Sequence, residues 1–349
     1  MNIYLFLIWL VFVIIFFQKI SNKKILILFI IIPMFFSLAT QVNIGTDYYA
    51  YIKIFKYGST RIEKGYLLFS EFLKYLSKDE RILFVGISLL QMILFYILLL
   101  KYQKIEKLKK IPFYVLVLCT STNSYMMMFN GLRSSIAALF FNLSLIFYLE
   151  KKYILTIILI ILGGNFHTSI YFAVGIIFLL SKLLKKEYCG IVILTSLILC
   201  FLINKLELIK KGSEIIYNLN LDFYYKNYLV SKHMFNYVEG LGIGTIINFL
   251  FCLLAGALYK KIIENKKNIF LYNLGFLGIG LKFLFAGIPI LSRMLEYFNI
   301  AQALVIYSFL NLTLKKKYFY IGIIILLFYL LQTIVGVERM LEFNKLKSL

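Results

Sequence analysis

An arginine and a histidine at matching ends of neighbouring apolar segments are the residues of this sequence best placed to do chemistry. Arg133 opens an apolar run that ends at the charged turn Glu150–Lys152, and a second run leads back to Asn165 and His167. Charged side chains at the edge of the hydrocarbon core of a membrane cost free energy unless they are hydrated, paired with an opposite charge or part of a functional site. We therefore interpret this pair as the centre of a site at one face of a membrane.

Asp47 and His167 are the two candidate catalytic bases. The segment Asn43–Tyr49 is either a turn that caps the next helix or a loop that holds Asp47 as a carboxylate at the rim of the site. A lone histidine is usually a structural group. His167, however, follows a Gly-Gly-Asn stretch at 163–165 that we expect to break the apolar run and free its backbone groups. His233 has no such setting.

The candidate ligands for an anionic substrate are Arg133 and Arg293. Each is either an arginine that extends its charge to the membrane surface or a bidentate phosphate ligand. Arg293 and Tyr297 are four residues apart and could both reach a phosphosugar, whereas the spacing of Arg293 and Glu296 also fits an intrahelical ion pair. The other binding candidates are Glu63, Asn165 and Tyr66.

Glu63 and Tyr66 begin an amphipathic run before the third long apolar segment. Apolar residues recur in it at helical spacing, namely Tyr66, Phe69, Phe72, Leu73 and Leu76. Such a helix either lies in the membrane interface or forms the floor or lid of an outer cavity.

Several other kinds of chemistry have no pattern in the sequence. There is no G-x-S-x-G, P-loop or H-E-x-x-H motif, and the only adjacent acids are Asp79 and Glu80. The four cysteines lie within apolar runs and show no metal or disulfide spacing. We expect neither a metal nor a cofactor.

The composition indicates the elements that position these residues. Of 349 residues, 62% are hydrophobic and 15% charged, and apolar runs follow one another nearly end to end. The formal charge of +22 comes from lysines in short turns between these runs. This distribution is typical of loops that set the orientation of a membrane protein, and it does not indicate a nucleic-acid-binding surface. We predict an all-α, polytopic transmembrane bundle of about 12 segments, in a single domain over residues 1–349.

If the short basic turns lie on the cytoplasmic side of the membrane, the chain has one consistent membrane topology. Both chain ends, two longer loops (about 40–81 and 204–240), the Asn130–Gly131 turn, the 163–167 bend and the 287–293 loop then lie outside. The short runs 153–162 and 168–180 are either a hairpin or one bent span, and the flanking lysines favour the hairpin. The first run, Ile3–Phe17, is predicted to be an anchor and not a cleaved signal.

These motifs together resemble the EpsG family of exopolysaccharide proteins and the related Wzy-type O-antigen and capsule polymerases. The matching elements are Gly45-Thr46-Asp47-Tyr48 with Tyr51, Glu63-x-Gly65-Tyr66, Arg133, Phe166-His167-Thr168-Ser169, and Ser292-Arg293 to Tyr297. Where the family often has proline after the glutamate, this chain has Lys64.

The resemblance implies a glycosyltransferase in the bacterial cytoplasmic membrane, with its active site on the outer face. It would transfer a growing glycan from undecaprenyl pyrophosphate to a lipid-linked repeat unit, beside a flippase and a chain-length regulator. Arginines would stabilise the leaving pyrophosphate, and Asp47 or His167 would be the base. The alternatives are a lipid-linked oligosaccharide flippase or transporter, a glycan ligase, a membrane acyltransferase and a structural membrane protein.

Overall fold

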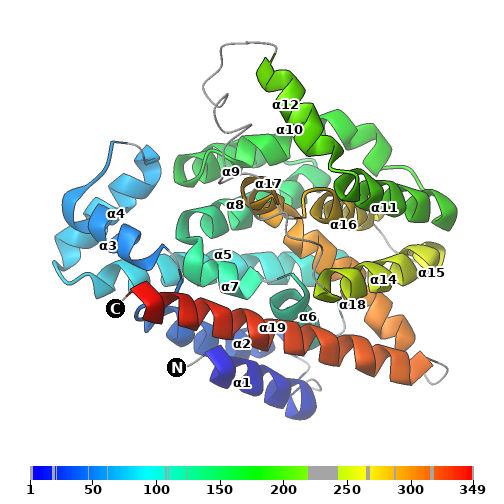
Figure 1. The fold of residues 1–349 in the computed structure, drawn as a ribbon. Coiled ribbons are helices and arrows are strands. Elements are labelled where there is room, and N and C mark those ends of the chain that lie inside the picture. The colour runs from blue at the N-terminus through cyan, green and yellow to red at the C-terminus, as the bar shows by residue number, and fades with distance from the viewer. Residues whose placement is uncertain are drawn as a thin grey trace. The chain divides into compact units, whose positions relative to one another are not determined.

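The computed structural model describes residues 3–347 except 18–19, 21, 46, 61, 107, 109, 123, 219–242, 265–267, 287 and 315–317. The described residues are mostly helical and contain no strand, which confirms the all-α prediction. They form two compact units, one of Met1–Ile176 with Leu326–Leu349 and the other of Ile177–Ile325 (Figure 1). That both belong to one domain stays a prediction.

Apolar helices identify a membrane protein. Among the described residues, three helices are long and apolar enough to cross a bilayer: α5 (Arg81–Glu106), α8 (Leu132–Leu149) and the Phe319–Glu338 part of α19 (Phe319–Lys347). A fourth span is possible if α11 (Gly190–Lys205) and α12 (Leu208–Asn218), bent by 60°, act together. Six further apolar helices have 10–17 residues. The count of about 12 segments is not confirmed.

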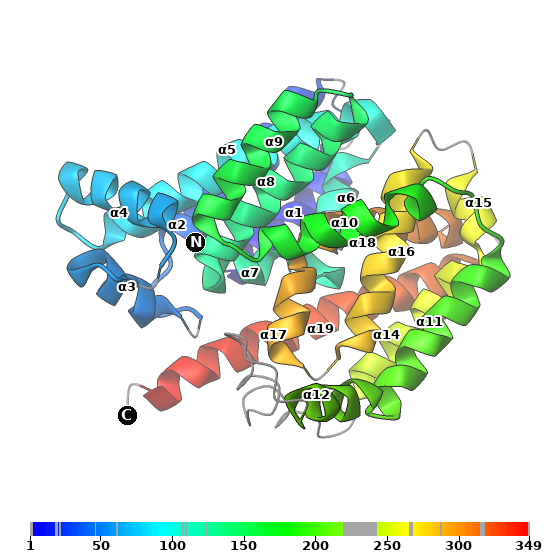
Figure 2. The ribbon, with the colours of Figure 1, turned by 90° about the horizontal axis from the view of Figure 1, so that it is seen from above.

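The helices of the first unit carry most of the candidate site. Besides α5 and α8 they are α1 (Ile3–Phe16), α2 (Lys23–Ala39), α3 (Tyr48–Tyr57), α4 (Lys64–Leu76), α6 (Ile111–Ser121), α7 (Ser124–Asn130), α9 (Tyr153–Phe166), the start of α10 (Ile170–Leu184) and α19 from Leu326 onward. Helices α8 and α9 lie side by side (Figure 2). Two contacts join α5 to α8: Gln91 Nε2 donates to Ser135 Oγ at 2.7 Å, and Lys101 Nζ lies 2.8 Å from Glu150.

The apolar chain between 111 and 130 is not one continuous helix. It forms α6 and α7, separated after Ser121. The hydroxyls of Thr120, Ser121 and Thr122 donate to carbonyls four residues back at 2.8, 2.7 and 2.6 Å, and such bonds bend helices. The predicted Asn130–Gly131 turn is confirmed, because α7 ends at Asn130 and Gly131 is the N-cap position of α8.

The prediction that residues 163–165 break the apolar run was wrong. Helix α9 continues to Phe166, and the chain turns at 167–169 before α10. Gly163 is buried against α8, where an added Cβ would lie 3.1 Å from Cβ of Phe140. This glycine therefore permits close helix packing instead of ending the helix. The hairpin formed by the two runs stays a prediction.

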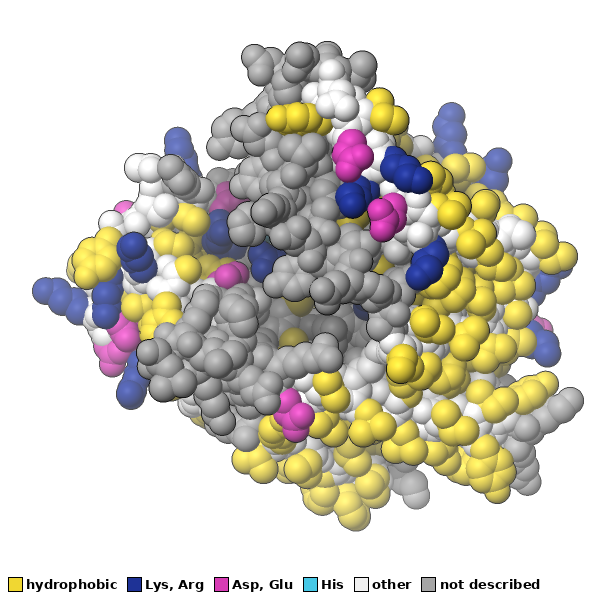
Figure 3. Space-filling model, viewed as in Figure 1, with side chains coloured by type: hydrophobic (Ala, Val, Ile, Leu, Met, Phe, Trp, Pro, Cys, Tyr) yellow, Lys and Arg dark blue, Asp and Glu magenta, His cyan; other side chains and the backbone are white. Residues whose placement is uncertain are grey.

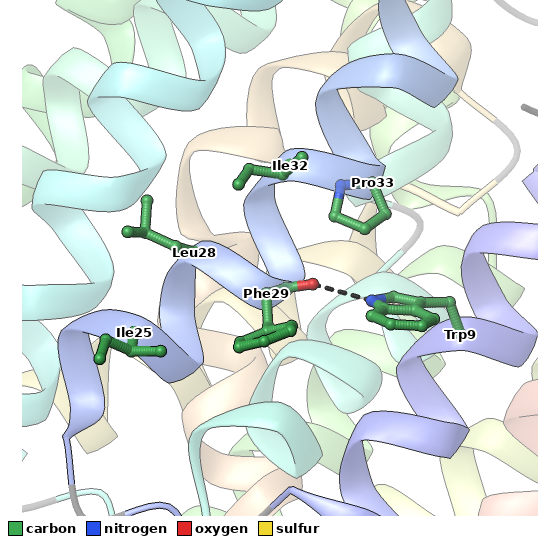
Figure 4. A pocket seen from close by; sticks show the side chains of 6 residues that line it. All are labelled: Trp9, Ile25, Leu28, Phe29, Ile32 and Pro33. Carbon is green, nitrogen blue, oxygen red and sulfur yellow. Dashed lines mark hydrogen bonds between the residues drawn. The ribbon is translucent and has the colours of Figure 1, made fainter.

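Helices α1 and α2 are joined by a hydrogen bond that compensates for a proline. Pro33, inside α2, has no N–H to donate to the carbonyl of Phe29 four residues back. The indole Nε1 of Trp9 donates to that carbonyl at 2.8 Å (Figure 4). An apolar hollow beside this bond is lined by Trp9, Ile25, Leu28, Phe29, Ile32 and Pro33.

The predicted outer loop 40–81 is largely helical. Helices α3 and α4 lie together at one end of the first unit (Figures 1 and 2). The predicted amphipathic helix is confirmed as α4, but its buried face differs from the predicted one. Tyr66, Ser70 and Leu73 are buried, whereas Phe72 and Leu76 are exposed.

The second unit contains α11, α12, α14 (Ile243–Ala257), α15 (Tyr259–Ile263), α16 (Ile269–Leu284), α17 (Pro289–Met294), the 3₁₀ helix η2 (Leu295–Phe298) and α18 (Asn299–Thr313). Asn204 of α11 donates to the carbonyls of Leu284 and Ala286 at 2.9 and 2.8 Å. These hydrogen bonds supply donors for carbonyls at the C-terminal end of α16, where intrahelical donors are lacking. Apolar side chains cover the exposed face of α11 and α14, among them Ile191, Leu199, Leu250 and Leu254 (Figure 3). This face suits contact with lipid.

The predicted loop around Arg293 contains α17, so Arg293 lies on a short helix. The last helix, α19, continues to Lys347. Of the predicted loop 204–240, the described part includes α12, and residues 219–240 lie outside the described residues.

Candidate active site

A carboxylate joins the two residues from which the sequence interpretation started. Arg133 lies in the first turn of α8, just after the Gly131 N-cap position, and Glu63 occupies the N-cap position of α4. Arg133 Nη1 donates a hydrogen bond to Glu63 Oε2, and the side chain of Glu63 is only 13% exposed. Residues 70 positions apart in the chain thus form an ion pair shielded from water.

His167 binds the other oxygen of the same carboxylate. Its Nδ1 lies 3.0 Å from Glu63 Oε1, and the backbone N–H of Thr168 donates to that oxygen at 3.2 Å. An ionised carboxylate only accepts hydrogen bonds, so Nδ1 carries the proton in this contact. In a neutral imidazole, Nε2 is then left with its lone pair.

The surroundings of Glu63 keep it ionised. Burial alone would raise the pKa of its carboxyl group, but the hydrogen bond from His167 and the charge of Arg133 outweigh this effect. The pKa falls from 4.5 to about 2. Glu63 is therefore a fixed negative charge at neutral pH, and its donors hold both of its oxygens.

Two tyrosines complete this cluster. Arg133 Cζ lies 5.9 Å from the ring centre of Tyr66, and the charge of Arg133 also acts on the Tyr51 hydroxyl. Burial raises the pKa of both phenols. The sequence analysis names Tyr51 as part of the family resemblance but not as a site residue. Its position one helical turn after Asp47 is the signal that places it on the same face of α3.

Asp47 belongs to the same unit and is held by its backbone. It occupies the N-cap position of α3, but its side chain makes no capping hydrogen bond, unlike the capping role considered for it. Its N–H donates to Asn130 Oδ1 at 3.2 Å. Gly45, with φ of 88°, packs so closely on Asn130 that a Cβ would lie 2.7 Å from Oδ1. Gly45 and the backbone of Asp47 thus both contact Asn130, three residues before Arg133.

Asn165 supports the site from the end of α9. Its exposed side chain donates from Nδ2 to the carbonyl of Ile161 at 2.9 Å. A Cβ on Gly65 would lie 2.6 Å from Cβ of Asn165, so the start of α4 packs tightly on the end of α9 here. The structure therefore places Asn165 under the start of α4, beside the turn that carries His167.

Arg293 and Tyr297 belong to the second unit, whereas the other candidate residues belong to the first. Arg293 is exposed on α17, whereas Tyr297 is buried in η2. His233 and Arg61 lie outside the described residues. Within the described part of the chain, no group of three His, Cys, Asp or Glu side chains could hold a metal ion.

The comparison with known families finds one family that covers this chain. The model of the EpsG family matches residues 24–347, nearly the whole chain, and includes every site residue named above. Members of that family are Wzy-type polymerases. No curated protein and no solved structure matches the chain. The family and the apolar helices together indicate a membrane polysaccharide polymerase.

Proposed function

Because this chain belongs to the EpsG family, we propose that it transfers a growing glycan from undecaprenyl pyrophosphate to a lipid-linked repeat unit. The reaction takes place at the outer face of the bacterial cytoplasmic membrane, next to a flippase and a chain-length regulator. The observation that carries the proposal is the joint binding of Glu63 by Arg133 and His167. It combines a candidate base with a candidate pyrophosphate ligand in one cluster.

His167 is the base in this proposal. Its Nε2 takes the proton of the acceptor hydroxyl while the hydroxyl oxygen forms a bond to C1 of the donor sugar. The bond from C1 to the pyrophosphate oxygen breaks, and its electron pair leaves with the carrier. Glu63 holds Nδ1, so it fixes the tautomer and stabilises the imidazolium that forms.

Arg133 stabilises the leaving pyrophosphate. A guanidinium has five N–H donors, so it can hold Glu63 and phosphate oxygens together. Charge that develops on a leaving group is stabilised best by donors already fixed in place, and Glu63 fixes this one. Arg293 is proposed as a second ligand of the phosphosugar, and Asp47, Tyr66 and Asn165 as groups that position the sugars.

The test of the overall function is the glycan pattern of a strain that lacks this protein. Single repeat units on the lipid carrier identify a polymerase. Long polymer that stays on the carrier identifies a ligase instead, and loss of all glycan outside the membrane identifies a flippase. Either of the last two patterns would refute the proposal.

The assignment of the base is tested by two variants in isolated membranes. His167→Asn should lower turnover by about 100- to 10,000-fold and still retain the lipid-linked donor, because positioning survives and proton transfer does not. Asp47→Asn should have a milder effect. The opposite order would make Asp47 the base, and parental polymerisation in both variants would show that neither residue is.

A further inference from the structure

Helix α4 carries an exposed apolar stripe that the proposed reaction does not use. The stripe consists of Leu68, Phe72, Tyr75 and Leu76, which recur at i, i+4, i+7 and i+8 and therefore share one side of the helix. Tyr75 is 90% exposed, and Phe72, the least exposed of the four, is still 56% exposed. Large apolar side chains that gather in one exposed patch mark an interaction surface, whereas single ones do not.

The stripe points away from the Arg133–Glu63–His167 cluster. Tyr66, whose ring centre lies 5.9 Å from Arg133 Cζ, marks the side of α4 that faces the cluster. On the buried side of the helix, Leu73 packs on α5, where a Cβ added to Gly86 would lie 2.4 Å from Leu73 Cδ2. Tyr75 follows Tyr66 by about two and a half helical turns, so it projects from the opposite side. The stripe is therefore not the floor or lid of that site.

Both ends of α4 are attached to the first turns of helices that can cross a membrane, α5 and α8. After α4 ends, four residues link it to Arg81, where α5 begins. The link is held by two hydrogen bonds, from the N–H of Asp79 to Ser77 Oγ at 3.1 Å and from the N–H of Arg81 to Asp79 Oδ1 at 2.9 Å. Before α4 begins, Glu63 binds Arg133 in the first turn of α8.

Helices α5 and α8 begin at the same face of the membrane. Gln91 contacts Ser135 in their first halves, and Lys101 contacts Glu150 toward their other ends. Because the two contacts follow in the same order along both helices, the helices run in the same direction. Helix α4 has 13 residues, fewer than the roughly 20 that cross a bilayer. Tied to the starts of α5 and α8, it therefore lies along this face of the membrane.

The third side of α4 is charged. Lys64, Glu71 and Lys74 are exposed there. Lys74 Nζ donates to the carbonyl of Lys56 at 2.8 Å, which brings the exposed Lys53 and Lys56 of α3 to the same region. Figure 3 shows hydrophobic and basic side chains together over this end of the first unit. A helix with an apolar side and a lysine-bearing side suits the interface of a bilayer that contains anionic lipids.

We infer that the exposed stripe of α4 binds the lipid surface of the membrane, with its apolar side chains among the acyl chains and the neighbouring lysines at anionic headgroups. This inference does not depend on the proposed function, because it concerns the bilayer and not the glycan. It places Glu63, at the start of α4, and with it Arg133 and His167, at the depth of the headgroups. In the proposed reaction, the pyrophosphate of the lipid carrier lies at that same depth.

The test measures how deep the stripe lies in a bilayer of known composition. A cysteine-free, full-length protein receives Tyr75→Cys, is labelled there with an environment-sensitive fluorophore, and is reconstituted as single copies in nanodiscs of phosphatidylglycerol and phosphatidylcholine. Nitroxide lipids labelled near the headgroup should quench the fluorophore strongly, and those labelled at the bilayer centre weakly, because an interfacial helix lies about 5–10 Å into the boundary of headgroups and acyl chains. Glu71→Cys, on the charged side of the same helix, is the matched control and should be quenched much less.

A second variant tests whether the apolar side chains hold the helix in the lipid. Leu68→Asp combined with Phe72→Asp should reduce the quenching at position 75 to the level of the control. It should leave the melting temperature in detergent at the parental value, because both side chains are exposed. Equal quenching at positions 71 and 75 of the otherwise parental protein would overturn the inference. So would a fluorophore at position 75 that becomes shielded only in nanodiscs with two copies, which would identify a second copy of this chain as the partner.

Discussion

Replacing Glu63 with glutamine tests the central contact of the site with almost no change in shape. The amide keeps one acceptor but loses the charge that Arg133, His167 and Thr168 now share. Its NH₂ group can donate to Nδ1 of His167, which would move the imidazole proton to Nε2. The nitrogen that takes the acceptor proton in the proposed reaction would then be blocked.

Two magnitudes follow from the structure. A pKa lowered from 4.5 to about 2 means that ionised Glu63 contributes roughly 3 kcal/mol of stability at neutral pH. Because the folded-state pKa is the lower one, this contribution is complete above pH 4.5 and is lost as the pH falls toward 2. For turnover, an Asp→Asn change beside the histidine of a serine protease costs about 10,000-fold, which sets the expected scale.

The assay measures polymer length in membranes and melting temperature in detergent. Glu63→Gln should abolish long polymer and lower the melting temperature at pH 7, and the melting-temperature gap to the parent should shrink at pH 4 and below. Glu71→Gln, an exposed position on the same helix, is the control and should behave like the parent. Parental polymer length in Glu63→Gln would refute the argument that this carboxylate sets the tautomer of His167.

Three further predictions concern the arginine, the proline and the orientation of the chain. Arg133→Lys should lose most polymerisation at normal protein levels, since an ammonium cannot reproduce the planar fork, and full activity would favour simple membrane anchoring. Trp9→Phe should destabilise the protein by about 1–3 kcal/mol in thermal unfolding, because it leaves a carbonyl unmet. Pro33→Ala should largely rescue it by restoring the helical N–H. In a cysteine-free background, a cysteine at Lys64 should react with an impermeant thiol reagent in intact cells, and one at Lys152 should not; the reverse would invert the topology.

Much of the site could be predicted because its residues stand at breaks in hydrophobic runs. Arg133, His167, Glu63 and Tyr66 each follow or begin such a break, and the structure brings these four together. What could not be predicted is that Glu63 is their common partner. That contact depends on how α4 docks on α9, where Gly65 meets Asn165, and no local pattern encodes a contact across 100 residues.

The errors in the predicted fold have local physical causes. The glycines at 163 and 164 suggested a break, but a buried glycine beside another helix allows close packing, and only the neighbour decides between the two outcomes. The break after Ser121 was visible in the run Thr120, Ser121 and Thr122, whose hydroxyls compete for backbone carbonyls. The predicted buried face of α4 failed because apolar residues cover more than one face, and burial of Tyr66 leaves Phe72 exposed.

The charge of the cluster suggests why a glutamate stands between the arginine and the histidine. With His167 neutral, the charges of Arg133 and Glu63 cancel, so neither is left as an unpaired buried charge before substrate binds. In the proposed reaction the imidazole gains a proton as the pyrophosphate gains negative charge. The cluster then becomes positive at the moment when a positive charge stabilises the leaving group most, and the low exposure of Glu63 shields that attraction from water. An arginine and a histidine without this carboxylate would repel each other at the same step.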